Sequence, residues 1–413
     1  MPAFDDLLSY LDESPSPFHA VSASVARLGA AGFRVTSHAA VDDAVFAESK
    51  GVLTHGGAVI AWSWPRQSGA GRGGLFVGAH TDSPCLRLKP RPNSRAAGLS
   101  VLEVEIYGGV LLNSWLDRDL GLAGVVHSVD GASRLCETRR PIARVPQLAI
   151  HLDRDVNDKG LLLNRQNHMR PIWSSDGGDV LDLLGIGPDE AFDIALFDVT
   201  PATLVGAGNE FIASGRIDNL VSCWAAVDAI RHTETDRPMI VCLFDHEEVG
   251  SESTTGAAGP LLEHVVDELL RVRGFGDKRF DFLRKSMCIS ADNAHGLHPN
   301  YPERHDANHA PLVNRGPALK HNANQRYATS AKGAALMRRV ATEAGVPLQD
   351  FVSNNAMPCG STIGPITATR LGIETVDVGV PQLAMHSARE TCGSSDPLAL
   401  RDLMIAAAKT SDY

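Results

Sequence analysis

Short apolar runs that alternate with helical patterns constrain the fold of this chain more than any other feature. Residues 239–244 (MIVCLF), 286–290 (SMCIS) and 374–380 (ETVDVGV) have the length and apolar character of buried strands. Residues 217–232 and 329–346 carry apolar side chains at helical spacing. Buried strands that alternate with helices predict an α/β fold with a mostly parallel central sheet.

Several of these apolar runs end in ionisable residues. Residues 74–79 lead into His80, Thr81 and Asp82, residues 239–244 into Asp245, His246, Glu247 and Glu248, and residues 286–290 into Ala291 and Asp292. The carboxyl ends of parallel strands share one edge of the sheet, which is where ligands bind. Because unpaired carboxylates are costly to bury, we expect a positively charged partner at this edge.

Two imidazoles and three carboxylates are candidate metal ligands: His80, Asp218, Glu248, Asp292 and His386. Five ligands suit two divalent ions when one carboxylate bridges them. Two divalent cations would also offset the repulsion between three carboxylates on one edge. The set therefore predicts a dinuclear metal centre that activates water for hydrolysis.

Two further residues complete the predicted site. Glu247 and Glu248 are neighbours, and in an extended chain their side chains point in opposite directions. We assign Glu248 to a metal ion and Glu247 to the water, as the general base. Asp82 lies two residues after His80 and is expected to orient the His80 ring.

Each of these residues also has a simpler interpretation. Asp218 begins a helical pattern and can serve as its N-cap, and adjacent glutamates commonly form a solvated surface. A thiol nucleophile at Cys359 lacks an identifiable base partner. Four histidines crowd one Pro-rich segment, for which we favour a structural or assembly loop over a further metal site: His295, His298, His305 and His309. Only the joint occurrence of the five candidate ligands favours the metal centre.

The middle of the chain has a different pattern from its two ends. Residues 99–109 (LSVLEVEIYGG) alternate in hydrophobicity, and turns marked by Pro and Gly recur nearby. We therefore predict a separate β-rich domain over residues 89–212. It would interrupt an α/β domain made of residues 1–88 and 213–413.

Charge and composition narrow the choice of partners. The formal net charge of −11 argues against nucleic acid or an anionic membrane surface as the main partner. We find no uncharged apolar segment long enough to span a membrane and no signal peptide at the start. The seven cysteines are scattered without a C-x-x-C pair, which is typical of reduced thiols. We expect a cytoplasmic protein.

Motifs from residue 14 to residue 390 together carry a resemblance to a known family. They are SPSPFHAV, GAHTDSP, QLAIHLDRDVN, GRIDNL, FDHEEVGS, SADNAHGLHPNYPERH, GPALKHNANQRYAT, CGSTIGPI and PQLAMHSARE. In these motifs the chain closely resembles the aspartyl aminopeptidases, a family of dinuclear zinc exopeptidases.

The resemblance implies a role for each candidate residue. Two zinc ions would be held by His80, Asp218, Glu248, Asp292 and His386, with Asp218 as the bridging ligand. Glu247 would be the general base, and Asp82 would support catalysis. Such nitrogen and oxygen ligands also accept manganese or cobalt. The implied fold is a three-layer α/β/α catalytic domain interrupted by a β-rich dimerisation domain.

The resemblance also implies partners beyond a single chain. Members of the family assemble from dimers into dodecamers, and a histidine matching His151 is contributed to the neighbouring subunit's site. Lys320 resembles the lysine that pairs with the acidic side chain of the substrate's first residue, which suits an ammonium group in a partly desolvated pocket.

The expected function is that of a metalloaminopeptidase that removes N-terminal residues, preferably Asp or Glu, from peptides. Two alternatives within the enzymes are a broad-specificity neutral aminopeptidase and a related dinuclear zinc deacylase. A third alternative is an assembly or cargo protein whose site is vestigial. The complete set of ligand positions disfavours this third alternative.

Overall fold

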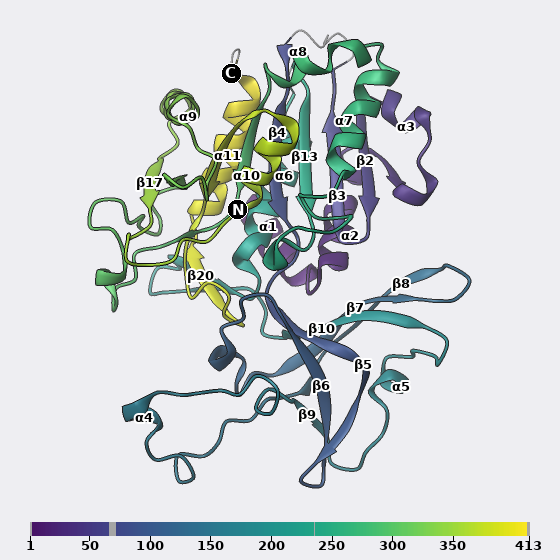
Figure 1. The fold of residues 1–413 in the computed structure, drawn as a ribbon, viewed down its shortest axis with the longest axis vertical. Coiled ribbons are helices and arrows are strands. Elements are labelled where there is room, and N and C mark those ends of the chain that lie inside the picture. Colours follow the sequence, from purple (N-terminus) through teal and green to yellow (C-terminus); the bar gives the residue numbers. More distant parts are fainter. Residues whose placement is uncertain (1, 66–71, 235, 411–413) are drawn as a thin grey trace.

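The computed structural model describes residues 2–65, 72–234 and 236–410, and the strands among them form three sheets (Figure 1). The largest sheet has the order β1-β2-β3-β13-β4-β14-β18-β16-β17. Its strands are β1 (Arg34–Ser37), β2 (Lys50–His55), β3 (Ala58–Ser63), β4 (Leu75–His80), β13 (Met239–Phe244), β14 (Met287–Ala291), β16 (Ala318–His321), β17 (Gln349–Val352) and β18 (Glu374–Gly379). The neighbours β13, β4, β14 and β18 run parallel, whereas β3 is antiparallel to both of its neighbours. The predicted mostly parallel central sheet is confirmed.

Helices pack on both faces of this sheet, so that it forms the middle of three layers. In β13, Val241 and Leu243 belong to one hydrophobic core, and Cys242 and Phe244 belong to the other. The first core is closed by α1 (Pro2–Glu13), α2 (Pro17–Ala30), α6 (Ile217–His232), α9 (Ala331–Ala344) and α11 (Asp396–Lys409). The second is closed by α3 (Asp43–Ala47), α7 (Leu261–Val272), α8 (Arg279–Leu283) and α10 (Ile363–Leu371).

Local signals in the sequence account for several helix ends. The side chain of Ser16 accepts a hydrogen bond from the backbone N–H of His19, and Pro17 opens α2. Helix α9 ends at Gly345, whose φ of 67° lies in the left-handed region that favours glycine.

A six-stranded sheet lies below the central sheet in Figure 1, with the order β8-β7-β10-β5-β6-β9. Its strands are β5 (Cys85–Ala96), β6 (Leu99–Tyr107), β7 (Leu120–His127), β8 (Ser133–Ala143), β9 (Ile172–Ser174) and β10 (Ala191–Asp198), and the short helices α4 (Val156–Lys159) and α5 (Val180–Leu183) accompany it. All its strand pairings are antiparallel, and it has its own hydrophobic core. A β-rich middle is therefore present, while the boundaries at 89 and 212 and a role in dimerisation stay predictions.

A small third sheet connects distant parts of the chain, with the order β11-β12-β20-β19-β15. Its strands are β11 (Thr203–Val205), β12 (Phe211–Ser214), β15 (Ala294–His295), β19 (Pro381–Leu383) and β20 (Glu390–Gly393). Strand β12 leads into α6, and the turn between β19 and β20 contains His386. This sheet therefore brings Asp218, His295 and His386 to the same region of the molecule.

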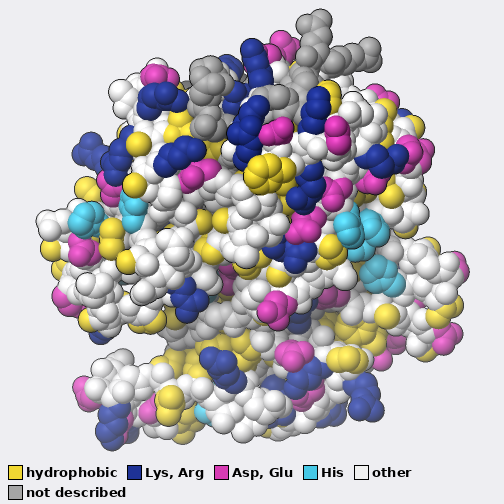
Figure 2. Space-filling view, turned by 45° about the horizontal axis from the view of Figure 1, so that its top comes forward, with side chains coloured by type: hydrophobic (Ala, Val, Ile, Leu, Met, Phe, Trp, Pro, Cys, Tyr) yellow, Lys and Arg dark blue, Asp and Glu magenta, His cyan; other side chains and the backbone are white. Residues whose placement is uncertain are grey.

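The surface carries charges of both signs. Figure 2 shows acidic and basic side chains interspersed over the face in view, and a notch at the lower left separates the lower part of the molecule from the part above. Among the described residues, no helix combines the length and hydrophobicity that a membrane span requires.

Candidate metal centre

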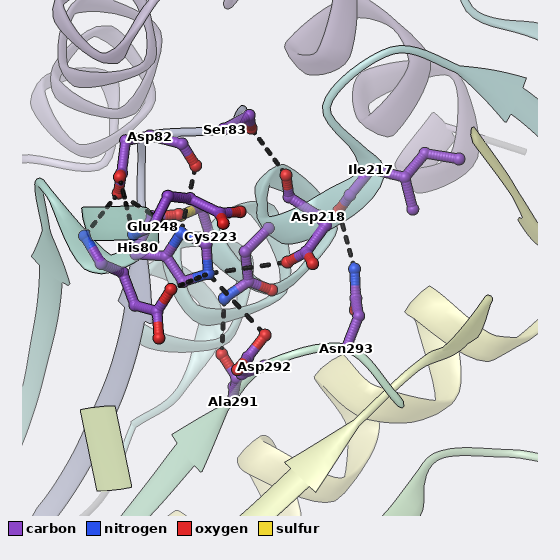
Figure 3. A network of polar contacts seen from close by, with 12 residues as sticks. His80, Asp82, Ser83, Ile217, Asp218, Cys223, Glu248, Ala291, Asp292 and Asn293 are labelled. Carbon is purple, nitrogen blue, oxygen red and sulfur yellow. Dashed lines mark hydrogen bonds and ion pairs between the residues drawn. The ribbon is translucent and has the colours of Figure 1, made fainter. Parts of the chain in front are cut away.

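The strands β4, β13 and β14 deliver ionisable side chains to one edge of the central sheet (Figure 3). His80 is the last residue of β4 and lies opposite Phe244, the last residue of β13. Asp292 directly follows β14. The prediction that these strand ends meet at one edge of the sheet is confirmed.

Asp218 lies at the irregular start of α6. Its φ of −83° and ψ of 106° are not helical, and its backbone N–H donates to the carboxylate of Glu390. The peptide bond from Asp218 to Asn219 is cis. The Asp218 carboxylate faces His80 on one side and His386 on the other, so its surroundings differ from those of a helix N-cap.

The five candidate ligands form two groups that share Asp218. His80 Nε2 lies 3.5 Å from Asp218 Oδ1 and 3.7 Å from Asp292 Oδ1. His386 Nε2 lies 3.6 Å from Asp218 Oδ2 and 3.3 Å from Glu248 Oε1. Two ligand atoms on one tetrahedral zinc ion are about 3.4 Å apart, because each is about 2.1 Å from the metal. Both groups therefore fit this ion.

Unpaired oxygens and pKa values indicate that the centre is built for cations. Asp218 Oδ1 and Glu248 Oε1 are buried and make no well-aligned hydrogen bond within the described residues, although each faces a histidine nitrogen, His80 Nε2 at 3.5 Å and His386 Nε2 at 3.3 Å. Burial raises the pKa of Glu248 to about 7, although His386 opposes this. Burial alone would lower the pKa of His386, but Asp218 and Glu248 raise it to about 11. The carboxylates thus favour a positive charge between them, as bound metal would supply.

Glu247 lies beside the two groups, with Oε2 3.9 Å from His80 Nε2. It belongs to the short 3₁₀ turn Glu247–Val249 that follows β13. Burial raises its pKa to about 8, and Asp292 contributes to the increase while His80 reduces it. His80, Glu247 and Glu248 also lie close enough to form a third possible ligand group. The geometry therefore allows Glu247 either to face a water or to bind a metal.

Asp82 connects His80 to the glutamate turn. Its carboxylate is completely buried and accepts hydrogen bonds from the backbone N–H groups of Glu247 and Glu248, both at 3.1 Å. His80 Nδ1 lies 3.1 Å from the Asp82 carbonyl oxygen and 3.4 Å from its Oδ1. These contacts fix the His80 ring with Nε2 toward Asp218, as its expected orienting role requires.

Glu390 is a residue that the sequence patterns did not single out. Its carboxylate is buried and accepts from the backbone N–H of Asp218 at 2.9 Å and from that of His386 at 2.7 Å. Gln382 donates to it as well, at 3.3 Å. Glu390 therefore holds two candidate ligands from distant parts of the chain. Its position four residues after His386 was the only available signal.

Lys320 lies next to Asp292 and is 2% exposed. Its Nζ donates to the carbonyl oxygens of Asp292 and Asn293, at 3.1 and 3.0 Å, and lies 3.6 Å from Asp292 Oδ2. Burial would raise the pKa of Asp292, but Lys320 and His80 hold it well below its usual range.

His295 also belongs to this region, although the sequence favoured a structural loop for it. His295 is exposed to solvent, yet the surrounding protein and the positive charge of Lys320 lower its pKa, and Asp218 acts on this pKa in the opposite direction. The backbone N–H of His298 donates to Nε2 of the His305 ring, and His309 pairs with Asp306 at 2.7 Å. Within the described residues, these three histidines take part in no group of metal ligands.

His151 is exposed and lies in the segment between β8 and α4. No contact described for the candidate ligands involves His151. Its neighbours Leu148, Ile150 and Leu152 are exposed as well, at 63%, 46% and 74%. In this single chain, His151 is therefore not placed at the centre.

The sequence and the fold were also compared with those of known proteins. Residues 10–404 match the family model described as aminopeptidase I zinc metalloprotease (M18). A probable M18 family aminopeptidase 2 of Streptomyces coelicolor is 47% identical over 97% of this chain and 96% of its own length. The chain is also similar to a structure from a cryo-EM study of the Ape4 and Nbr1 complex, with a TM-score of 0.92, 35% identity, and coverage of 98% of this chain and 85% of the other. The S. cerevisiae mApe1 dodecamer structure has a TM-score of 0.83 and 28% identity, covering 98% and 95% of the two chains.

Proposed function

The chain belongs to the M18 family and is a zinc metalloaminopeptidase, and from this premise we propose how its residues act and which peptides it prefers. One zinc ion would be held by His80, Asp218 and Asp292. The other would be held by Asp218, Glu248 and His386. The observation that carries this assignment is that the two oxygens of Asp218 face different histidines.

Bound zinc would supply a Lewis acid that polarises the scissile carbonyl and lowers the pKa of water. In this proposal Glu247 takes the proton from the attacking water and passes it to the leaving amine. Its side chain lies near His80, and its backbone N–H is held by Asp82. Asp82 keeps the His80 ring in place during the reaction.

Lys320 would give the enzyme its preference for Asp or Glu at the peptide N-terminus. Two of its three ammonium hydrogens are used by the carbonyl oxygens of Asp292 and Asn293. The third has Asp292 Oδ2 at 3.6 Å, which is longer than a hydrogen bond, and would pair instead with a substrate carboxylate. The lysine is desolvated enough for such a pair to be strong.

Assembly would complete the site. A dodecamer is described for the S. cerevisiae relative, and we extend this state, built from dimers, to the present chain. The exposed segment around His151 would then pack against a partner and place His151 at the partner's site. Burial of Leu148 and Leu152 would stabilise this contact. The β-rich region 89–212 would be the dimerisation domain.

Removal and restoration of metal tests the proposal. Purified protein is treated with a chelator, dialysed, and titrated with zinc, manganese or cobalt. Activity is measured on Asp-, Glu-, Ala- and Leu-naphthylamides and on an N-acetylated control. We expect activity to disappear on chelation, to return with two ions per chain, and to be highest on the Asp and Glu substrates.

Full activity after chelation would contradict the metal centre. Equal rates on all four substrates would contradict the acidic preference and favour a broad-specificity neutral aminopeptidase. Turnover of the N-acetylated control would instead indicate a deacylase.

A further inference from the structure

The segment of residues 107–114, which begins with the last residue of β6, reaches the candidate metal centre from the side of the six-stranded sheet. It contacts Asp82 and the candidate ligand His386. The Tyr107 hydroxyl donates to Asp82 Oδ2 at 2.6 Å, the Gly109 carbonyl oxygen lies 3.1 Å from His386 Nδ1, and the Leu111 N–H donates to the His386 carbonyl oxygen at 3.0 Å. The proposed reaction does not use these contacts directly.

The Tyr107 hydroxyl donates a hydrogen bond to the buried carboxylate of Asp82. Tyr107 is 8% exposed, and Asp82 is completely buried. Asp82 Oδ1 accepts from the Glu247 N–H, whereas Oδ2 accepts both from the Glu248 N–H and from Tyr107. Hydrogen bonds to a buried charged group are among the stronger ones in proteins. The hydroxyl therefore helps to fix the carboxylate that orients both His80 and the glutamate turn.

The six-stranded sheet fixes the ring of Tyr107 in turn. The Arg87 guanidinium of β5 lies 3.8 Å from the centre of this ring. Arg87 also pairs with Asp193 of β10 at 3.1 Å. A guanidinium over an aromatic face stabilises the ring in place. The orientation of the hydroxyl is thus set by side chains outside the central sheet.

Two glycines allow the segment to approach the candidate ligands closely. A Cβ atom at Gly108 would lie 3.1 Å from the Glu248 Cβ, and one at Gly109 would lie 3.1 Å from His386 Nδ1. Gly108 also has a φ of 74°, which other residues rarely adopt. The segment is therefore packed closely against Glu248 and His386, two members of the same ligand group.

We propose that Tyr107 is a positioning residue for the metal centre. Through Asp82, its hydroxyl holds His80 and the Glu247–Glu248 turn in the geometry that binds metal and places the general base. This inference rests on the proposed metal centre. It adds that the six-stranded sheet contributes a side chain on which the centre depends.

The test compares Tyr107→Phe with Tyr10→Phe. Tyr10 is also buried, and its hydroxyl pairs with Ser24 at 2.9 Å in the hydrophobic core. Both substitutions remove one buried hydroxyl and leave the ring. Zinc affinity is measured on metal-free protein by competition with a chromogenic chelator, together with kcat, KM and the melting temperature of each variant.

We expect the zinc affinity and the kcat of Tyr107→Phe to be about 10- to 100-fold lower than those of the wild type, with little change in KM. Tyr10→Phe is expected to lower the melting temperature while leaving zinc affinity and kcat unchanged. Equal zinc affinities and equal kcat values in the two variants would overturn the inference, even if both melt earlier. Failure of the wild-type protein to bind two zinc ions would instead refute the proposed metal centre, so the two failures are distinguishable.

Discussion

At the scale of single residues, different side chains are expected to bind the metal ions and to transfer the proton. Glu247→Gln keeps the size of the side chain but removes its basicity. We expect kcat to fall by about 10²- to 10⁴-fold. The zinc content should remain at two ions per chain, as measured by atomic absorption. Loss of one ion from this variant would show that Glu247 is a ligand, which its place beside His80 and Glu248 also permits.

Glu390 gives a second prediction, because both of its oxygens act as acceptors. The isosteric Glu390→Gln replaces one acceptor with an NH₂ group that would face the N–H of Asp218 or of His386. We expect a loss of about 10- to 100-fold in zinc affinity. Glu190→Gln is the matched control, because Glu190 accepts from the Gly187 N–H in the six-stranded sheet region. The same chelator competition measures both variants, and equal affinities would contradict the role of Glu390.

Lys320 gives a prediction about substrate preference. Lys320→Met should lower kcat/KM for Asp- and Glu-naphthylamides much more than for Ala- and Leu-naphthylamides. The ratio is the informative quantity, because Lys320 also bonds to the backbone of Asp292 and Asn293. The Lys320 ammonium lies over the ring of Tyr327 and the Lys50 ammonium over that of Phe33, so Lys50→Met is a suitable control. An unchanged ratio in Lys320→Met would remove this lysine from the account of specificity.

At the scale of elements, the positions of the strand ends explain why the meeting of several ionisable side chains could be predicted. Apolar runs such as 239–244 are local signals, and parallel pairing brings their ends together without further information. The meeting of His80, Glu248 and Asp292 at one edge of the sheet could therefore be predicted from the sequence. From the sequence, Asp218 could be either a metal ligand or a helix N-cap, because both interpretations place an aspartate at the start of a helical pattern. In the structure, the start of α6 at Asp218 is irregular.

Other contacts between residues far apart in the sequence could not be predicted, for a physical reason. Tyr107 lies in a segment of alternating hydrophobicity, which predicts only the face of the sheet to which its side chain points. Its contact with Asp82 arises from the way in which the two sheets meet. Glu390 and His295 lie in the small third sheet, which combines strands from three distant parts of the chain. No local pattern specifies such a sheet, so the sequence favoured a loop for His295.

A close contact between strand β18 and Asp292 leads to an element-scale prediction. A Cβ atom at Gly379 would lie 1.9 Å from the Asp292 carbonyl oxygen. Gly379→Ala should therefore destabilise the fold by about 1–3 kcal/mol and also weaken zinc binding. Gly121→Ala in β7 would meet the Thr138 carbonyl oxygen at 2.4 Å and is expected to destabilise without affecting zinc. Thermal unfolding and chelator competition check both, and similar zinc affinities would contradict the coupling through β18.

At the scale of the whole molecule, the exposed segment around His151 predicts dependence on assembly. His151→Ala should be poorly active, and Glu247→Gln should be inactive in its own assembly. Co-expression of the two variants should restore activity, because some intact Glu247 sites would then receive His151 from a neighbour. Differently tagged subunits allow the mixed oligomers to be purified. Mixed oligomers no more active than the two parent variants would contradict a shared site.

The central claim is that Asp218 lies between two zinc ions. It is tested most directly by anomalous diffraction at the zinc edge from crystals of the zinc-loaded protein. We predict two peaks, one about 2.0–2.2 Å from His80 and the other at a similar distance from His386, each in contact with a different oxygen of Asp218. A single peak, or two peaks of which one does not touch Asp218, would contradict the account.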